Sequence, residues 1–165
     1  MGNQLKKANN VPERTFANRT LLVRLVSVYD GDTVTIVTRL SRKEPFYKYR
    51  LRLAGIDAPE RKPPVISVNR DLIIAAAMSA KKQLEQHIGS LMLVDFCKED
   101  KYGRLMGTLW STKSDGCKCL YKYKKSVNIN QWMLDNGFAI RYDGGAKIQF
   151  TKKQLLQIVK KSNNL

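Results

Sequence analysis

The sequence predicts an α+β domain in which helices pack against the outside of a small β-barrel. Two observations support this. Strand-like runs of β-branched or alternating residues occupy the first and middle parts of the chain, and segments with apolar residues at helical spacing interrupt and follow them. With 165 residues and no internal repeat, the chain is expected to form one hydrophobic core. We expect a polar, basic arm over residues 1–18 and one folded domain over residues 19–165.

Three strands are predicted at the start of this domain. Residues 21–30 and 32–40 are rich in β-branched side chains and are joined by a very short turn. The next run, residues 47–56, alternates between side chains expected to enter the core and basic side chains expected to face outward. The core set is Tyr49, Leu51 and Leu53, and the basic set is Lys48, Arg50 and Arg52.

A helix and two more strands are expected next. After a loop with three prolines, residues 58–69, the apolar residues of segment 70–88 follow helical spacing, and Gly89 is expected to end that helix. Two further strands are predicted over residues 90–97 and 104–111, with a short polar turn between them.

The last part of the chain is predicted to contain an insertion and two helices. Residues 111–126 hold lysines and tyrosines, which either extend a nucleic-acid surface or form a solvated hairpin. Residues 128–140 predict a short helix ended by Gly137, and residues 151–165 predict a basic amphipathic helix. The inward side chains of that last helix are expected to be Leu155, Leu156, Ile158 and Val159.

The charge is strongly basic. Thirty Lys and Arg residues stand against 14 Asp and Glu residues, so the formal net charge is +16. Such a field attracts polyanions, with nucleic acid as the first candidate and an anionic membrane or an acidic protein as the alternatives. The charge alone does not choose among them.

The sequence favours an intracellular, monomeric protein. No apolar run approaches the roughly 20 residues of a membrane helix, and the N-terminal segment lacks the apolar core of a secretory signal. Three cysteines, an odd number, argue for a reducing compartment. Gly2 after Met1 raises the alternative of a lipid-anchored N-terminus, but Lys6 stands where that motif needs Ser or Thr.

Carboxylates and arginines are the candidates for chemistry. The chain has one histidine, His87, inside a predicted helix, so a histidine base is not expected. The acidic and basic candidates occur in three short segments, each at the end of a predicted strand: DGDT, RLRLAGIDAPE and DKYGR. Each segment alone also has a structural interpretation, as an Asp-Gly turn, a helix-entry loop and a basic turn respectively.

Together the three segments contain the parts of a phosphodiester hydrolase. Asp32 and Asp57 could hold a hard divalent cation through their oxygens, and Glu60 could orient or deprotonate a water molecule. Two arginines from different strands could grip a phosphate and stabilise the charge of a five-coordinate phosphorus.

Four segments resemble, in order, the signature segments of the staphylococcal nuclease (thermonuclease-like) family. They are VYDGDTVTI, RLRLAGIDAPE, DKYGRLMGTLW and INQWMLDNGFAI, and the resemblance spans about Leu22 to Tyr142. It implies a five-stranded OB-fold β-barrel with three packed α-helices, and Ca²⁺-dependent hydrolysis of DNA and RNA. Mg²⁺ and Mn²⁺ are the alternative ions.

The resemblance also implies roles for the acidic residues. Asp32 and Asp57 match the metal carboxylates, and Glu60 matches the acid that acts on the attacking water. Ala58 replaces the threonine of the best-matched family member at a position that serves the metal through its backbone carbonyl. Asp30 is then expected to support the turn rather than to bind the metal directly.

Basic and aromatic positions carry over in the same way. Arg52 and Arg104 match the two phosphate-binding arginines. Lys101 and Tyr102 match a basic and aromatic pair that contacts a terminal phosphate or a base, and Tyr142 falls near a pocket tyrosine.

The resulting hypothesis is a nuclease with little sequence specificity that prefers single-stranded DNA and RNA. The alternative is a non-catalytic OB-fold module that binds single strands or a protein, suggested by the basic tails and the lysine-tyrosine insertion. A third hypothesis, binding to a membrane surface, rests on Gly2 and the basic C-terminal helix.

Overall fold

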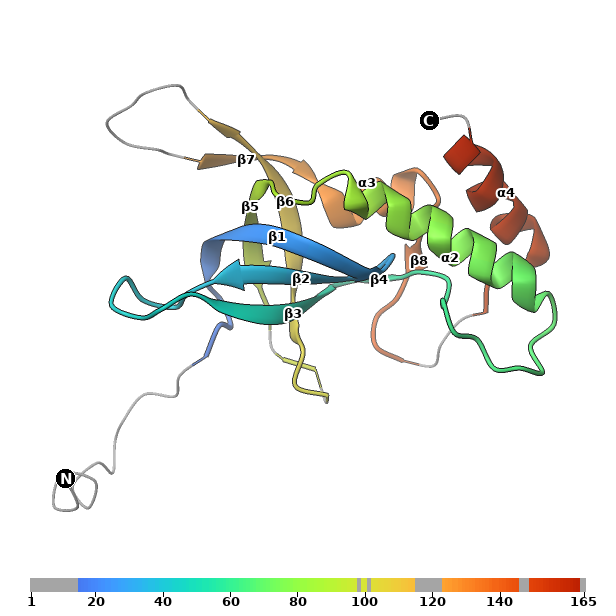
Figure 1. The fold of residues 1–165 in the computed structure, drawn as a ribbon, viewed down its shortest axis with the longest axis horizontal. Helices are drawn as coiled ribbons and strands as arrows, with labels where there is room; N and C mark the ends of the chain where they lie inside the picture. Colours follow the sequence, from blue (N-terminus) through green and yellow to red (C-terminus); the bar gives the residue numbers. More distant parts are fainter. Residues whose placement is uncertain (1–14, 98, 101, 115–122, 146–148, 164–165) are drawn as a thin grey trace, which may run out of the picture.

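The computed structural model describes residues 15–97, 99–100, 102–114, 123–145 and 149–163. Five strands close into a β-barrel beside a group of helices (Figure 1). The barrel strands are β1 (Thr20–Asp30), β2 (Thr33–Thr38), β3 (Tyr47–Leu53), β5 (Leu91–Phe96) and β6 (Leu105–Ser114). Antiparallel pairing runs in the order β3-β2-β1-β5-β6, and parallel pairing of β3 with β6 closes the barrel. The predicted OB-type α+β fold is confirmed.

The helices of the described chain lie to one side of the barrel. They are α2 (Arg70–Glu85), α3 (Ile129–Asp135) and α4 (Lys152–Asn163), and α2 packs against α4 (Figure 1). A short strand β4 (Ile56–Asp57) pairs with β8 (Ile140–Arg141) between the barrel and the helices. None of the described helices is long and apolar enough to cross a membrane.

The barrel interior is filled by the inward side chains of the alternating strands. In β3, Leu51 and Leu53 are fully buried and Tyr49 packs at the edge of the core, whereas Arg50 is exposed. The predicted alternation of this strand is therefore confirmed, because successive side chains of a strand point to opposite faces. The outward row of basic side chains becomes important below.

Two predicted helical features need correction. Helix α2 ends at Glu85, not near residue 88, because His87 and Ile88 donate backbone hydrogen bonds to residues three positions earlier, and Gly89 follows with a positive φ of 88°. In α4, Leu156 was expected to face inward, but it is 42% exposed. Leu155 and Ile158 cover the core, and the helical rotation of about 100° per residue turns Leu156 away.

The two described ends of the predicted insertion form paired antiparallel strands. Strand β6 continues beyond the barrel and pairs with β7 (Tyr123–Asn128), with Lys113 opposite Lys124. Residues 115–122, which are half of the lysine-tyrosine segment 111–126, lie outside the described residues. The structure also describes only residues 15–18 of the predicted arm, where Phe16 is buried with its ring 4.8 Å from that of Tyr49.

Candidate active site

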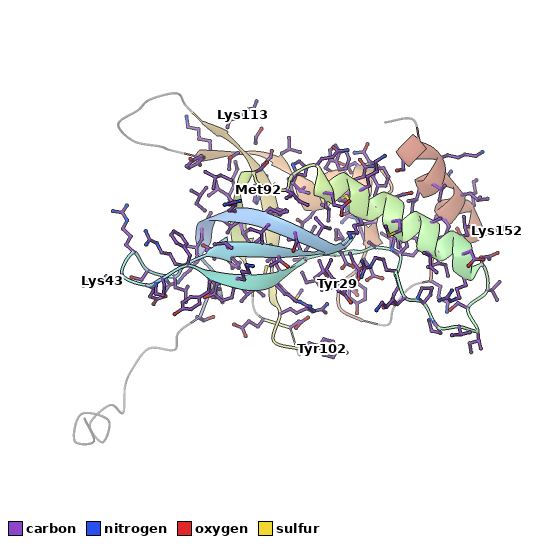
Figure 2. All side chains as sticks on the ribbon, viewed as in Figure 1. Tyr29, Lys43, Met92, Tyr102, Lys113 and Lys152 are labelled. Atoms are coloured by element: carbon purple, nitrogen blue, oxygen red, sulfur yellow. The ribbon has the colours of Figure 1, made fainter. Side chains whose placement is uncertain are left out.

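A cavity of about 680 Å³ opens at one end of the barrel, where the β1–β2 turn meets the loops after β4, before β6 and after β8. Its walls include every predicted site residue that the structure describes. These residues are Asp32, Arg52, Asp57, Ala58, Glu60, Tyr102, Arg104 and Tyr142. The other predicted site residue, Lys101, is not among the described residues. In Figure 2 Tyr102 projects from the lower edge of the barrel, far from Lys113 on the β6–β7 hairpin. The hairpin therefore extends away from this cavity.

Asp32 is held by hydrogen bonds at the start of β2. Its backbone carbonyl accepts from the amide of Leu53 at 2.8 Å. Its carboxylate accepts from the amide of Ala58 at 3.2 Å and from the Thr33 hydroxyl at 2.8 Å. These donors come from β2, β3 and the loop after β4. The side chain of Asp32, only 9% exposed, therefore has a defined direction toward the cavity.

The β1–β2 turn approaches α2 closely because three residues are small. A Cβ atom built on Gly31 would lie 2.8 Å from the Cβ atoms of both Ala58 and Ala80. Ala80 belongs to α2 and Ala58 follows β4, so the turn is wedged between them. Glycine at position 31 is required by this contact rather than by backbone conformation, and it sets the depth at which Asp32 sits.

Arg52 bridges the two buried carboxylates. Its Nη1 lies 2.7 Å from Asp32 Oδ2 and its Nη2 lies 2.9 Å from Asp57 Oδ1. Nη2 also donates to the carbonyl of Ile56 at 3.2 Å. Burial alone would lower the pKa of Arg52, but the two carboxylates outweigh it and raise that pKa above its usual value. The guanidinium is therefore a fixed positive charge between two negative ones.

A second arginine borders the same turn. Arg61 Nε lies 3.1 Å from Asp30 Oδ1 at the end of β1. Burial raises the pKa of Asp30, and the charges of Asp32 and Glu60 add to this, although Arg61 opposes it. Several carboxylates thus act on one another at this end of the barrel, which makes the site attractive for a cation.

Arg104 is oriented by a tight turn before β6. Asp100 accepts from Arg104 Nε at 2.6 Å and from the backbone amides of Tyr102 and Arg104 at 2.9 Å each. Burial disfavours the charged carboxylate, but these hydrogen bonds outweigh it and hold the pKa of Asp100 below its ordinary value. Asp100 thus fixes the backbone and the side chain of the arginine together.

Two tyrosines flank the arginines. The Arg52 guanidinium lies 5.6 Å from the ring centroid of Tyr142, whose amide donates to the Gly55 carbonyl at 3.1 Å. The Arg104 guanidinium lies 5.5 Å from the ring of Tyr102, which is 71% exposed. Tyr102 therefore offers a ring to solvent at the mouth of the cavity.

Residues 50–164 match the family model described as Staphylococcal nuclease homologue. The chain belongs to the staphylococcal nuclease family. This match covers β3 from Arg50 onward, the cavity-lining residues from Arg52 onward and all the described helices.

Three curated proteins are similar to this chain over most of its length. An uncharacterized endonuclease of Escherichia coli O157:H7 is 30% identical over 120 residues, which are 73% of this chain and 60% of that protein. Protein ParB of Escherichia coli is 30% identical over 118 residues, 72% of this chain and 55% of that protein. The probable endonuclease LCL3 of Yarrowia lipolytica is 29% identical in a match that covers 87% of this chain and 65% of that protein. The chain thus spans less than two thirds of the length of each.

The residues of this staphylococcal nuclease family member fit a hard divalent cation. Asp32 and Asp57 are buried, they bind the same guanidinium, and they offer oxygen, the donor that Ca²⁺ and Mg²⁺ prefer. Among the described residues, no group of three or more acidic, cysteine or histidine side chains is placed to hold a metal ion. Two carboxylates supplemented by backbone carbonyl, water and phosphate oxygens are a sufficient donor set for such ions.

Asn130 is a supporting residue that the sequence analysis missed. It is buried on α3; its Oδ1 accepts from Leu109 at 3.0 Å, and its Nδ2 donates to the carbonyls of Ala54 and Gly107 at 2.8 and 3.2 Å. It thereby ties α3 and β6 to the chain just before the strand that carries Asp57. The available signal was a polar side chain beside the apolar Ile129 in a short helix.

Proposed function

We propose that this chain is a metal-dependent nuclease that hydrolyses phosphodiester bonds of DNA and RNA with little sequence specificity. One observation carries the proposal. Two buried carboxylates, an exposed carboxylate and two arginines from separate segments of the chain line the same cavity, in a protein of net charge +16. Ca²⁺ is the proposed ion, with Mg²⁺ and Mn²⁺ as alternatives. The preferred partners are single-stranded DNA and RNA, while intracellular location and a monomeric state stay predictions.

Asp32 and Asp57, with the Ala58 carbonyl, would hold the cation. Bound there, the ion supplies Lewis-acid stabilisation of a phosphate oxygen. Glu60 is exposed on the wall of the same cavity, where its carboxylate can accept a hydrogen bond from the attacking water and orient or deprotonate it. The oxygen of this water attacks phosphorus and forms a new P–O bond. The bond from phosphorus to the leaving-group oxygen breaks, and that oxygen takes up a proton.

The arginines stabilise the charge that develops on phosphorus. Arg52 has five N–H donors, and its contacts with Asp32, Asp57 and the Ile56 carbonyl engage three of them. The remaining donors can bind a phosphate while the carboxylates stay in place. Arg104 is held through its Nε, so its Nη groups are left to face the substrate. Removing one such group typically lowers the rate by about 10²–10³-fold.

The test is a gel assay of cleavage of labelled single-stranded DNA and RNA with Ca²⁺, Mg²⁺, Mn²⁺ or chelator. Glu60→Gln and Arg104→Ala should each lose about two orders of magnitude or more in rate. Glu85→Gln is the matched control, because it makes the same chemical change at the end of α2, outside the cavity. Unchanged rates in both active-site variants would refute the proposal.

Binding without cleavage under every ion would favour the non-catalytic OB-fold module instead. The same protein preparations distinguish the two functions. A binder retains a strong dependence of affinity on salt in Glu60→Gln and in the parent protein alike. A nuclease converts the bound strand to shorter products only in the parent protein.

A further inference from the structure

A second groove, of about 560 Å³, adjoins the candidate active site. It is lined by Lys48, Tyr49, Arg50, Tyr102, Gly103 and Arg104. Tyr102 and Arg104 also line the larger cavity, so the two hollows meet at these residues. The carboxylate cluster lies in the larger cavity, whereas the charged side chains of the groove are all basic.

The alternation of β3 explains why this groove is basic. Lys48, Arg50 and Arg52 are outward residues of one strand, whereas Leu51 and Leu53 fill the core. Alternate side chains of a strand lie on the same face and are separated by about 6.6 Å. The row therefore leads from Arg52 in the candidate active site along the outside of the barrel.

Lys48 and Arg50 differ from the arginines of the candidate active site in that their positive charges are not paired with any carboxylate that the structure describes. Arg52, Arg61 and Arg104 are each paired with at least one aspartate. Within the part of the chain that the structure describes, neither Lys48 nor Arg50 forms an ion pair.

Arg50 is nevertheless held in place, since its guanidinium lies 5.0 Å from the ring centroid of Tyr29. An aromatic contact positions the cation without neutralising it. Its charge therefore stays available to a ligand.

We propose that Lys48 and Arg50 form, with the exposed ring of Tyr102, a subsite for the nucleic-acid strand next to the scissile phosphate. The two cations would bind neighbouring phosphates and Tyr102 would stack on a base. The outer faces of strands 2 and 3 of OB barrels are an established location for oligonucleotides, which agrees with this placement. The inference rests on the proposed function, because its ligand is the substrate strand.

The subsite predicts that affinity grows with strand length. The first measurement is fluorescence anisotropy with single-stranded oligonucleotides from a dinucleotide to a dodecamer, in the Glu60→Gln protein with Ca²⁺. In that background Arg50→Ala and Lys48→Ala should each weaken dodecamer binding by about 5-fold to 10-fold. Each should also lower the slope of log affinity against log salt by about 0.7. Dinucleotide binding should change much less.

Two controls separate this site from general charge. Lys160→Ala removes one positive charge from the exposed side of α4, outside both hollows, and should leave dodecamer affinity and the salt slope within twofold of the Glu60→Gln parent. Arg50→Lys keeps the charge and should recover most of the affinity. In the active protein, Arg50→Ala should raise KM for the dodecamer far more than it lowers kcat.

The outcomes for the subsite and for the nuclease function are distinguishable. If the double variant of Lys48 and Arg50 binds the dodecamer as tightly as its parent, or if Lys160→Ala weakens it equally, the subsite is refuted even when cleavage is normal. If strands bind with the expected length dependence but no ion supports cleavage, the subsite proposal is supported and the nuclease proposal is refuted.

Discussion

Asp100 and Arg104 form the ends of one tight turn, and the carboxylate of the first holds both the Nε and the backbone amide of the second. The turn is reciprocal, because the backbone amide of Asp100 donates to the carbonyl of Arg104 at 2.9 Å. The direction of Arg104 is therefore set before any substrate arrives. Preorganised donors of this kind avoid reorganisation during the reaction.

Asp100→Ala is expected to lower kcat by about 10-fold or more, because a misdirected arginine stabilises the transition state poorly. Steady-state kinetics on single-stranded DNA would measure this. Asp100→Asn keeps an acceptor for the backbone amides and should lose less. If kcat is unchanged in Asp100→Ala while Arg104→Ala is inactive, Asp100 does not position the arginine.

Replacing Asp30 should reveal its raised pKa in the pH dependence of stability. An acid whose folded pKa is raised destabilises the fold above that pKa, and the penalty disappears as pH falls to the unfolded pKa. Asp30→Asn should therefore increase the free energy of unfolding at neutral pH, in chelator, and the gain should vanish in acid. Urea unfolding at several pH values measures it. A gain that persists below the unfolded pKa would contradict this cause.

Cation binding should stabilise the fold independently of catalysis. A ligand that binds only the folded state at one hundred times its Kd adds about 2.7 kcal/mol to the free energy of unfolding. Thermal unfolding of Glu60→Gln with increasing Ca²⁺ should show a rising Tm. Asp57→Asn should abolish most of that rise, whereas Glu85→Gln should not. If no divalent ion raises the Tm, the result would argue against the carboxylate pair as a metal site.

Gly31→Ala should destabilise the protein by about 1–3 kcal/mol, as overpacking in a filled interior does. The added Cβ would meet the Cβ atoms of Ala58 and Ala80 at 2.8 Å. Denaturant unfolding measures the loss. Ala80→Gly removes one of these contacts, so a double-mutant cycle should show favourable coupling between positions 31 and 80. Strict additivity would mean that the turn relaxes without touching α2.

Asn130→Ala should cost about 2 kcal/mol or more, since it removes the side-chain partner of the Leu109 amide and of the Ala54 carbonyl. Because Asn130 holds the chain before Asp57, Ca²⁺ affinity measured by calorimetry should also fall. Gln131→Ala, on the exposed side of the same helix, is the control. Loss of stability with unchanged Ca²⁺ affinity would restrict Asn130 to a structural role.

Local patterns were enough to predict most of the elements. The alternation in β3 separated Leu51 and Leu53 from Arg50, and Gly137 marked the end of α3, because side-chain period and glycine conformation are properties of a few neighbouring residues. A prediction was wrong where the position of a side chain depended on packing against a distant part of the chain. Leu156 was predicted inward from its apolar character, but which face of α4 is covered depends on how that helix packs against α2.

The sequence by itself determined which residues are available for chemistry, since DGDT, GIDAPE and DKYGR supply carboxylates and arginines at the ends of strands. The tertiary structure decided how they are combined. Parallel pairing of β3 with β6 brings Arg52 and Arg104 to one cavity, and Arg52 lies across Asp32 and Asp57. The Arg52–Asp32 contact and the meeting of Arg52 with Arg104 at one cavity join residues far apart in the chain, and their geometry follows from barrel closure, which no local pattern encodes.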